Sequence, residues 1–384
     1  MDKEKQIKIV IGSNYGDESK GLVTRHFVKT TENPLVIFHN GSAQRGHTVD
    51  YNPDFRHVYH HFGCGTADKV PTYFAETFWI HPMEFRREWN EIVTTMGIIP
   101  NCYCDPNARI VTPFDMLVDH ATEAYITWDH QEPEHGSCGY GTWCATDRDP
   151  RNIFKVAQFL TFNYVEYYEI MKNVWYDCLA QLFKRGVDLD KIPEYKKYFT
   201  DPIVYENTVE HFKDDLRFFY AHITPIDFNT LYKMNYNFIF EGAQGLGLDK
   251  DCGKEWHTTS STGLTNPYNM LKDKEDFKAE VCYVSRAYNT RHGIGDLEEE
   301  VNKSSINKDM EDKTNVHNEF QGSLRYGYID NVEREKRILK DFTTVYGDNR
   351  FFRTNALTHC NEFPEINFNV YEYASFNPYS VLKK

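Results

Sequence analysis

The sequence lacks a long hydrophobic run, an excess of basic charge and a cysteine framework. No stretch approaches the roughly 18 consecutive apolar residues of a membrane span, and the apolar run that ends at Val10 is too short for a signal sequence. Basic side chains number 43 against 57 acidic ones, a formal net charge of −14, which argues against broad adhesion to nucleic acid or an anionic membrane. The nine cysteines, an odd number, suit reduced thiols in a cytoplasm. We therefore expect a cytoplasmic protein without a nucleic-acid or membrane partner.

Two groups of side chains resemble metal ligands, but neither has a standard zinc spacing with a second ligand pair. These groups are Cys102 with Cys104, and His57, His60 and His61 with Cys64. The sequence therefore gives only weak support to a zinc site in either group.

The apolar residues that are present predict a globular α/β fold. Hydrophobic side chains make up 40% of the 384 residues and aromatic ones 15%, enough for a sizeable core. Apolar runs of strand length alternate with helical patterns, which is typical of a mostly parallel central sheet with flanking helices. The expected strands cover residues 6–11, 34–38, 236–240 (ending before Gly242) and 279–284, and the first helix covers residues 22–30. Ligands of such folds bind at the carboxyl ends of the strands.

No Pro/Gly/Ser-rich linker divides the chain, so we expect one large domain over residues 1–384 with a mainly helical insertion over about 149–220. A helix is predicted from the Asp149 cap, with Pro150 at its first position, to Lys184, ending at Gly186. Its dense aromatic residues are expected to pack in the core.

A glycine-rich turn follows the first strand and opens the first helix, at residues 12–21 (GSNYGDESKG). Such a turn directs backbone N–H groups toward an anion, and Lys20 adds a cation for phosphate. The turn is not a regular Walker A motif because Asn14, Ser19 and Gly21 break its pattern. Asp17 and Glu18 are unusual, since carboxylates repel phosphate unless they hold Mg²⁺ or act as a base. The pattern fits a P-loop-like phosphate turn and an ordinary strand-to-helix turn equally well.

Three further loops have polar or glycine-rich sequences, and each alone also fits a structural turn. Residues 40–48 end in His47 and Thr48, which could lie over a bound phosphate. Residues 240–245 (FEGAQG) place Gln244 after a strand, and residues 136–142 (GSCGYGT) are long enough to surround a phosphate.

Taken together, these motifs resemble those of the adenylosuccinate synthetase family. The Gly-Asp-Glu-x-Lys-Gly turn, the Gly-His-Thr loop and the Glu-Gly-Ala-Gln-Gly turn occur in the family's order. The similarity also covers residues 258–262, 287–291 and 318–320, and so extends from residue 9 to about 361. It implies a Mg²⁺-dependent ligase that condenses L-aspartate with the 6-oxo position of a purine nucleotide, using a nucleoside triphosphate to form a 6-phosphoryl intermediate.

The resemblance also implies roles for individual residues. Asp17 matches the base at purine N1, His47 the group that stabilises the transferred phosphoryl, and Lys20 a cation that neutralises it. Asp17 and the Gly46 carbonyl match Mg²⁺ ligands. The triphosphate contacts are expected from Asn14, Gly16, Glu18, Ser19, Lys20, Gly21, Thr48, Thr358 and Asn361.

The remaining substrate contacts follow from the same resemblance. Purine-nucleotide contacts are expected from Asp17, Gln44, Ser137, Cys138, Arg151, Gln244 and Thr259. In the family an Arg from a second subunit reaches the nucleotide phosphate, and Arg151 is the nearest match, so the resemblance implies a homodimer. The family's arginine-rich aspartate loop is reduced here, and Ser323 and Arg325 are its expected aspartate contacts.

Two substrate assignments stay open at this stage. Asp17 favours IMP, with adenylosuccinate as product, and either GTP or ATP as donor. Residues 358–361 (THCN) replace the family's guanine-specifying Thr-Lys-x-Asp, and a Cys-Asn ending resembles the phage 2-aminoadenylosuccinate synthetases, which act on GMP or dGMP with ATP or dATP. For a viral chain the compartment is then the host cytoplasm. A nucleotide-binding regulator without catalysis is the alternative from another class.

Overall fold

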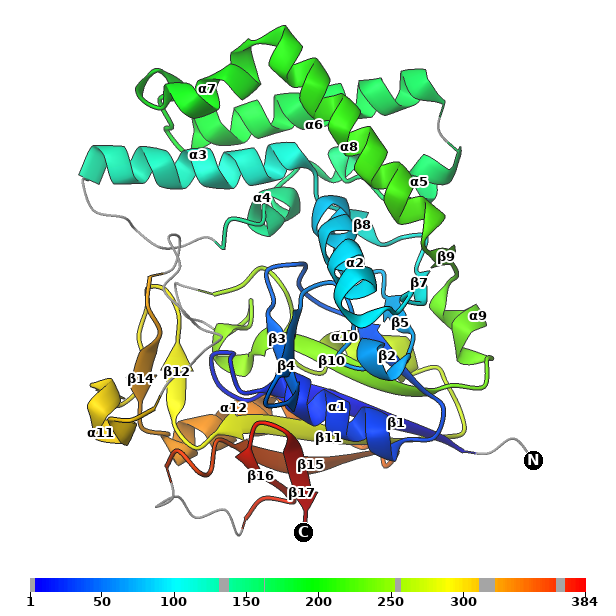
Figure 1. The fold of residues 1–384 in the computed structure, drawn as a ribbon, viewed down its shortest axis with the longest axis vertical. Helices are drawn as coiled ribbons and strands as arrows, with labels where there is room; N and C mark the ends of the chain where they lie inside the picture. The colour runs from blue at the N-terminus through cyan, green and yellow to red at the C-terminus, as the bar shows by residue number, and fades with distance from the viewer. Residues whose placement is uncertain (1–3, 131–137, 162, 253–256, 311–321, 364–369) are drawn as a thin grey trace.

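A computed structural model describes residues 4–130, 138–161, 163–252, 257–310, 322–363 and 370–384 (Figure 1). Its centre is a ten-stranded sheet whose strands are parallel except for the last pair, β16 and β17. The strands in spatial order are β17 (Ser380–Lys383), β16 (Tyr373–Asn377), β15 (Phe351–Thr358), β11 (Phe277–Arg286), β1 (Lys5–Gly12), β10 (Asn237–Gly245), β2 (Pro34–Phe38), β5 (Thr72–Phe74), β7 (Cys102–Cys104) and β9 (Thr224–Pro225).

Smaller sheets lie beside the central one. They are the hairpin β3 (His47–Asn52) and β4 (Phe55–Tyr59), the pair β6 (Trp79–Ile80) and β8 (Arg109–Ile110), and the sheet of β12 (Asn289–Arg291), β14 (Arg325–Gly327) and β13 (Glu300–Val301).

Twelve α-helices and five short 3-10 turns occur in the described residues. The helices are α1 (Lys20–Thr30), α2 (Pro82–Met96), α3 (Pro113–His130), α4 (Thr142–Thr146), α5 (Val156–Thr161), α6 (Tyr164–Lys184), α7 (Pro193–Thr200), α8 (Pro202–Ala221), α9 (Phe228–Tyr232), α10 (Thr265–Leu271), α11 (Lys303–Asn307) and α12 (Asn331–Phe342). The 3-10 turns cover Thr66–Asp68, Pro150–Asn152, Leu189–Lys191, Leu246–Leu248 and Thr343–Val345.

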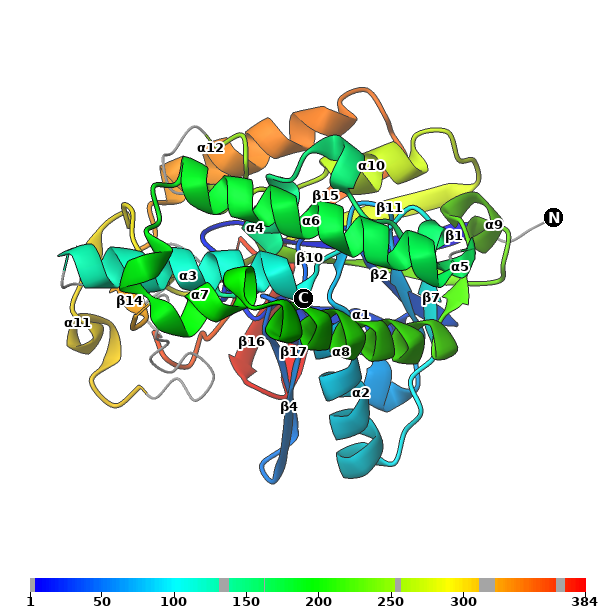
Figure 2. The ribbon, with the colours of Figure 1, turned by 90° about the horizontal axis from the view of Figure 1, so that it is seen from above.

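Both faces of the central sheet are apolar and covered, as a parallel sheet requires. In β1 the side chains of Ile7, Ile9 and Ile11 enter one core, and Val10 enters the other. Helix α1 packs on the Val10 side, and α10 and α12 pack on the opposite side (Figure 2). The α/β class with a large, mostly parallel sheet, predicted from the sequence, is therefore confirmed.

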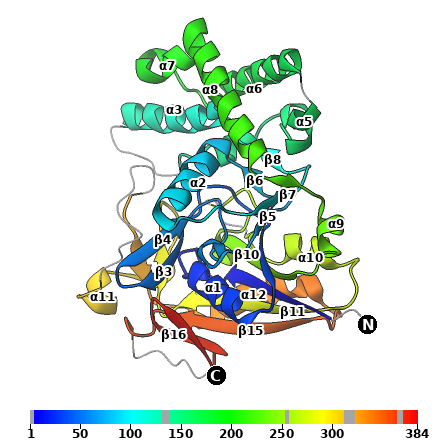
Figure 3. The same ribbon diagram turned by 45° about the vertical axis from the view of Figure 1, so that its right-hand side comes forward.

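A layer of helices lies beyond one end of the sheet, where α3, α6, α7 and α8 gather (Figures 1 and 3). The helical segment expected over about 149–220 lies within this layer, which begins earlier, at α3. None of the helices in the described ranges is long and apolar enough to span a membrane.

Two predicted elements differ from the structure. Strand β10 does not end before Gly242 but continues to Gly245, because the missing side chain of Gly242 lets the strand approach the Val10 carbonyl oxygen, which a Cβ would meet at 2.8 Å. The single helix predicted from residue 149 to 184 is divided into a 3-10 turn, α5 and α6. Asn163 starts a new helix there with a capping box, its side chain accepting from the Glu166 N–H.

Several aromatic side chains of this helical segment are also more exposed than predicted. Phe154 and Tyr167 are buried, but Tyr164 and Tyr176 are more than half exposed. The density of aromatic residues does not by itself show which helix face packs against a neighbour.

Candidate functional site

The phosphate turn connects β1 to α1 at the carboxyl edge of the sheet. Asp17 and Ser19 both have left-handed backbones, with φ of 57° and 60°, and Ser19 is the residue before α1. This sharp turn places the Asp17 side chain, which is half-buried, next to the helix N-terminus. The arrangement is the strand–turn–helix that an anion site requires.

The buried Glu18 carboxylate interacts with groups expected to bind the triphosphate. Its Oε1 accepts hydrogen bonds from the backbone N–H of Asn14 (3.0 Å) and of Gly16 (2.9 Å). Its Oε2 lies 2.8 Å from Lys20 Nζ, and both side chains are almost fully buried. Glu18 therefore neutralises Lys20 and holds the turn closed from inside, and a bound triphosphate must compete with it.

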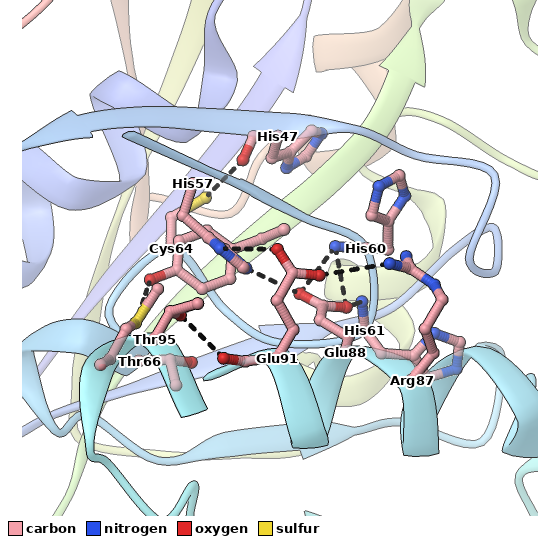
Figure 4. Close-up of polar contacts among 12 residues, drawn as sticks. His47, His57, His60, His61, Cys64, Thr66, Arg87, Glu88, Glu91 and Thr95 are labelled. Carbon is pink, nitrogen blue, oxygen red and sulfur yellow. Dashed lines mark hydrogen bonds and ion pairs between the residues drawn. The ribbon is translucent and has the colours of Figure 1, made fainter. Parts of the chain in front are cut away.

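A three-residue cluster of His47, Glu241 and Cys64 joins the start of β3 to β10. His47 Nδ1 lies 2.5 Å from Glu241 Oε1, and the Cys64 thiol donates to the same oxygen at 2.9 Å. Glu241 Oε2 also accepts the Cys64 backbone N–H, at 3.1 Å. Figure 4 shows Cys64 below β3, with its sulfur directed toward the His47 main chain.

Burial decides the protonation of this cluster. It lowers the pKa of His47 to about 4, although the Glu241 carboxylate opposes the shift. Burial alone would raise the pKa of Glu241, but the His47 hydrogen bond and the charge of Arg45 hold it below its usual value. Burial also raises the pKa of the Cys64 thiol. At neutral pH a neutral His47 thus donates Nδ1–H to an ionised Glu241, which leaves Nε2 as a base and acceptor. Lys20 is close enough to affect the His47 pKa.

The end of β10 is tied to the loop after β2. Asn40 donates its side-chain N–H to the Ala243 carbonyl (3.0 Å) and accepts the Ala243 N–H (2.9 Å). Gln244 follows with a left-handed φ of 62°, and its Oε1 accepts a hydrogen bond from Ser260 (3.4 Å). Thr259 is the half-buried neighbour of Ser260. The structure thus brings the segments of Gln244 and Thr259 together.

The end of β15 also lies against the phosphate turn. Buried Thr358 donates its hydroxyl to the Glu18 carbonyl at 3.1 Å. His359 Nε2 lies 2.8 Å from Ser19 Oγ, and Asn361 is exposed two residues further on. The segment expected to choose the donor base therefore adjoins the turn expected to hold the triphosphate.

Two arginines that sequence reasoning missed stabilise the phosphate turn. Arg286, buried at the end of β11, donates to the Asp17 carbonyl oxygen. Arg337 on α12 donates to the Ser13 carbonyl (3.3 Å) and the Asn14 side chain (3.1 Å). The position of Arg286 directly after an apolar strand was an available signal, whereas nothing local marked Arg337 within its helix.

The structure describes the surroundings of some, but not all, of the predicted nucleotide contacts. The Thr142 hydroxyl donates to Gln44 at 3.3 Å, which joins the loop of residues 40–48 to the segment of Cys138. Ser137 lies outside the described residues. Arg151 is highly exposed and paired with Asp149 at 2.6 Å.

The predicted aspartate contacts lie on and beside β14. Arg325 forms an ion pair with Glu300 and donates to the carbonyl oxygens of Gly293 (3.0 Å) and Gly295 (2.7 Å). Ser323 is exposed. A substrate carboxylate must therefore compete with Glu300 for Arg325.

The predicted metal ligands suit a hard cation. Asp17 offers a carboxylate beside the turn, and Gly46 is exposed one residue before His47. Carboxylate and carbonyl oxygens are the ligands that Mg²⁺ prefers. Thr48, the predicted triphosphate contact, follows His47 in β3.

The weak metal-ligand group of three histidines and Cys64 has separate contacts (Figure 4). His57 lies between Glu88 and Glu91 at 3.6 Å from each, His60 bonds the Ala43 carbonyl at 3.0 Å, and His61 Nε2 accepts the His81 N–H at 2.9 Å. Only Cys64 lies in the cluster with His47.

Comparisons with known proteins agree on one family. The family model for adenylosuccinate synthetase matches residues 9–345. The chain is 25% identical over 333 residues to an adenylosuccinate synthetase of Halothermothrix orenii, covering 84% of this chain and 72% of the relative. A second one, from Brachyspira hyodysenteriae, is 25% identical over 332 residues, with the same two shares.

Two solved structures have a similar fold. Fully ligated adenylosuccinate synthetase of Plasmodium falciparum superimposes with a TM-score of 0.66 and 18% identity, over 92% of this chain and 77% of the other. The cyanophage S-2L succinoaminodeoxyadenylate synthetase (PurZ), bound to dGMP and dATP, superimposes with a TM-score of 0.60 and 13% identity. The superposition covers 99% of this chain and 96% of the other. Together with the family match over most of its length, this shows that the chain belongs to the adenylosuccinate synthetase family and is a C–N ligase.

Proposed function

We propose that the protein joins L-aspartate to C6 of a purine nucleotide, with IMP as the nucleotide and GTP or ATP as the donor, to give adenylosuccinate. The observation that carries this proposal is the pairing of His47 with buried Glu241 near Lys20, beside a turn that holds Asp17. A purine 6-oxo group is a poor leaving group, so the donor must first phosphorylate it before the aspartate amine displaces it.

The residues of the site divide the tasks of this reaction between them. Asp17 takes the proton from purine N1 while Gln244 orients the base. His47 takes up a proton at Nε2 and donates it to the transferred phosphoryl, while the Glu241 carboxylate stabilises the charged ring and keeps it in place. Lys20 and the backbone N–H groups of the turn neutralise the phosphate charge once Glu18 yields them. Asp17 and the Gly46 carbonyl would hold Mg²⁺, which would supply charge neutralisation for the triphosphate.

The second candidate is the phage-type reaction on GMP or dGMP with ATP or dATP. A structural neighbour supports it, because the solved structure of the cyanophage enzyme, which has a similar fold, holds dGMP and dATP. Asn361 supports it as well, since an Asn offers one acceptor and one donor where Asp accepts two hydrogen bonds from guanine. Asp17 favours IMP.

A homodimer is part of the proposal. Arg151 is exposed on the 3-10 turn before α5, where a second subunit's nucleotide phosphate could draw it away from Asp149. Aspartate is the proposed amine, held by Arg325.

One assay separates the candidates. The pure protein is incubated with aspartate and Mg²⁺, with IMP, GMP or dGMP, and with GTP, ATP or dATP, and phosphate release and product mass are followed. We expect a succinylated product from one nucleotide class only. Asp17→Asn should abolish turnover while triphosphate binding persists. No product in any combination would refute both reactions, and nucleotide binding without turnover would identify a regulator.

A further inference from the structure

Cys64 is a buried nucleophilic side chain that the proposed reaction does not use. Ligand atoms of His47, Cys64 and Glu241 all lie within 4.8 Å of one another, the one such group of three in the described ranges. Cys64 and Glu241 are fully buried, and His47 is 7% exposed. Gly46, the residue before His47, is exposed, so His47 lies next to the surface.

We propose that His47, Cys64 and Glu241 form a binding site for a divalent cation of the zinc class, distinct from the Mg²⁺ position at Asp17 and Gly46. An imidazole nitrogen, a thiolate sulfur and a carboxylate oxygen are all zinc ligands, and three protein ligands leave a fourth position for water. The sulfur excludes Mg²⁺, which prefers oxygen ligands only.

The charges around the cluster are compatible with such an ion. The carboxylates of Glu241, Glu88 and Glu18 are near, against the cations of Lys20 and Arg45. Burial lowers the pKa of Arg45 only to about 10, so it stays charged at neutral pH. The three carboxylates and two cations together leave one net negative charge around the cluster. A divalent ion that displaces the thiol proton adds one positive charge, and the surroundings become neutral.

Binding rearranges protons in a defined way. The Cys64 S–H bond breaks, its proton goes to solvent, and a sulfur–metal bond forms. The His47 proton moves from Nδ1 to Nε2, so that Nδ1 can bind the ion. His47 then loses its hydrogen bond to Glu241 and the basic Nε2. The ion and the proposed phosphoryl transfer are therefore mutually exclusive, a consequence that rests on the proposed function.

The site itself is tested with Co²⁺ and the substrate-free full-length protein. We expect a thiolate-to-cobalt charge-transfer band, intense tetrahedral d–d bands and release of one proton per ion in weakly buffered solution. Cys64→Ser should remove the charge-transfer band and weaken binding by at least about tenfold. The matched control is Cys144→Ala, because Cys144 is also buried and its thiol donates to a carboxylate, that of Asp119 at 2.9 Å, with no histidine in the group.

Absence of the charge-transfer band in the wild-type protein, or its loss in Cys144→Ala, would overturn the proposal. Circular dichroism checks that each variant is folded, and Cys64→Ala gives a second variant should the serine protein fail. In the ligase assay, Zn²⁺ should inhibit the wild type at a concentration at least about tenfold below that for Cys64→Ser, each relative to its own metal-free rate. A protein without ligase activity that still shows the cobalt spectrum would refute the proposed function alone.

Discussion

At the scale of single residues, backbone strain is concentrated at the candidate site. Eight non-glycine residues in the described ranges have positive φ, and four of them belong to the candidate site: Asp17, Ser19, Gln244 and His359. Each such conformation costs on the order of 1 kcal/mol, and the surrounding contacts must maintain it. The Ser19–His359 hydrogen bond and the Arg286 contact to the Asp17 carbonyl are contacts of this kind.

Glu241→Gln tests the positioning of His47. The amide keeps the shape of the side chain but offers an N–H and no charge to His47 Nδ1, so the ring loses its preferred tautomer. We expect kcat to fall by at least about 10²-fold, by comparison with loss of the orienting carboxylate in other histidine-dependent sites, together with a change in the pH–rate profile.

Glu280→Gln is the matched control for Glu241→Gln. Glu280 is also a buried carboxylate, bound to Lys8 and Tyr373 at 2.6 Å each, but it lies six residues before the end of β11. Its loss should lower the free energy of unfolding while turnover of the folded protein persists. Equal kcat in the two variants would contradict the role of Glu241.

At the scale of elements, the site is assembled from loops that follow parallel strands. The ends of β1, β10, β2, β11 and β15 are neighbours in the sheet, so their loops meet at one edge. Hydrogen bonds between these loops and the strand ends then hold the site together: Asn40 to Ala243, and Thr358 to the Glu18 carbonyl. The turn before α4 is fitted against α3 in a similar way.

Two glycines with similar positive φ but different surroundings test how tightly the turn before α4 packs against α3. Gly141, before α4, has a φ of 69°, and a Cβ there would meet the Met116 nitrogen at 2.6 Å. Gly186, after α6, has a φ of 72° with open space around it. Gly186→Ala should lower the free energy of unfolding by about 1–2 kcal/mol, the cost of a left-handed alanine.

Gly141→Ala should lower the free energy of unfolding further, because the start of α3 must also shift. Urea denaturation of both variants measures the difference. Equal destabilisation would show that the turn before α4 is not tightly packed.

At the scale of the whole molecule, the protein has a formal net charge of −14 and carries neutral histidines in its interior. Burial lowers the pKa of His39 to about 3, of His47 and His81 to about 4, and that of His61 well below its usual value. All four occur within residues 39–81, between the end of β2 and the start of α2.

Because of these histidines, we expect the folded protein to lose stability in acid. Because their pKa values are lower in the folded state, the unfolded chain binds protons first as the pH falls below about 6.5, and each lost unit of pKa corresponds to about 1.4 kcal/mol. Between pH 7 and pH 5 the free energy of unfolding should therefore decrease, by on the order of several kcal/mol for the four together. Denaturant titrations at pH 7, 6 and 5 measure it, and an unchanged midpoint would exclude these groups as the cause.

Sequence reasoning succeeded where the signal is local. Apolar runs identified β1, β2 and β11 because a strand buried on both faces must be continuously apolar. The prediction was wrong where a residue far away in the sequence determines the local structure. Gly242 was interpreted as the end of a strand, but the glycine is explained by the Val10 carbonyl, which lies against it in the fold. The predicted site residues stay predictions, although the structure brings Asp17, Lys20, His47 and Gln244 to one edge of the sheet.

The sequence by itself determined the fold class and the family resemblance, since both depend on local periodicity and on short motifs in a fixed order. Only the tertiary structure decided which groups pair: Glu18 with Lys20, Glu241 with His47 and Cys64, and Arg337 with the phosphate turn. Except for Glu18 with Lys20, these partners come from elements far apart in the chain. Their pairing depends on burial, because a buried carboxylate or guanidinium must find a partner that no local pattern specifies.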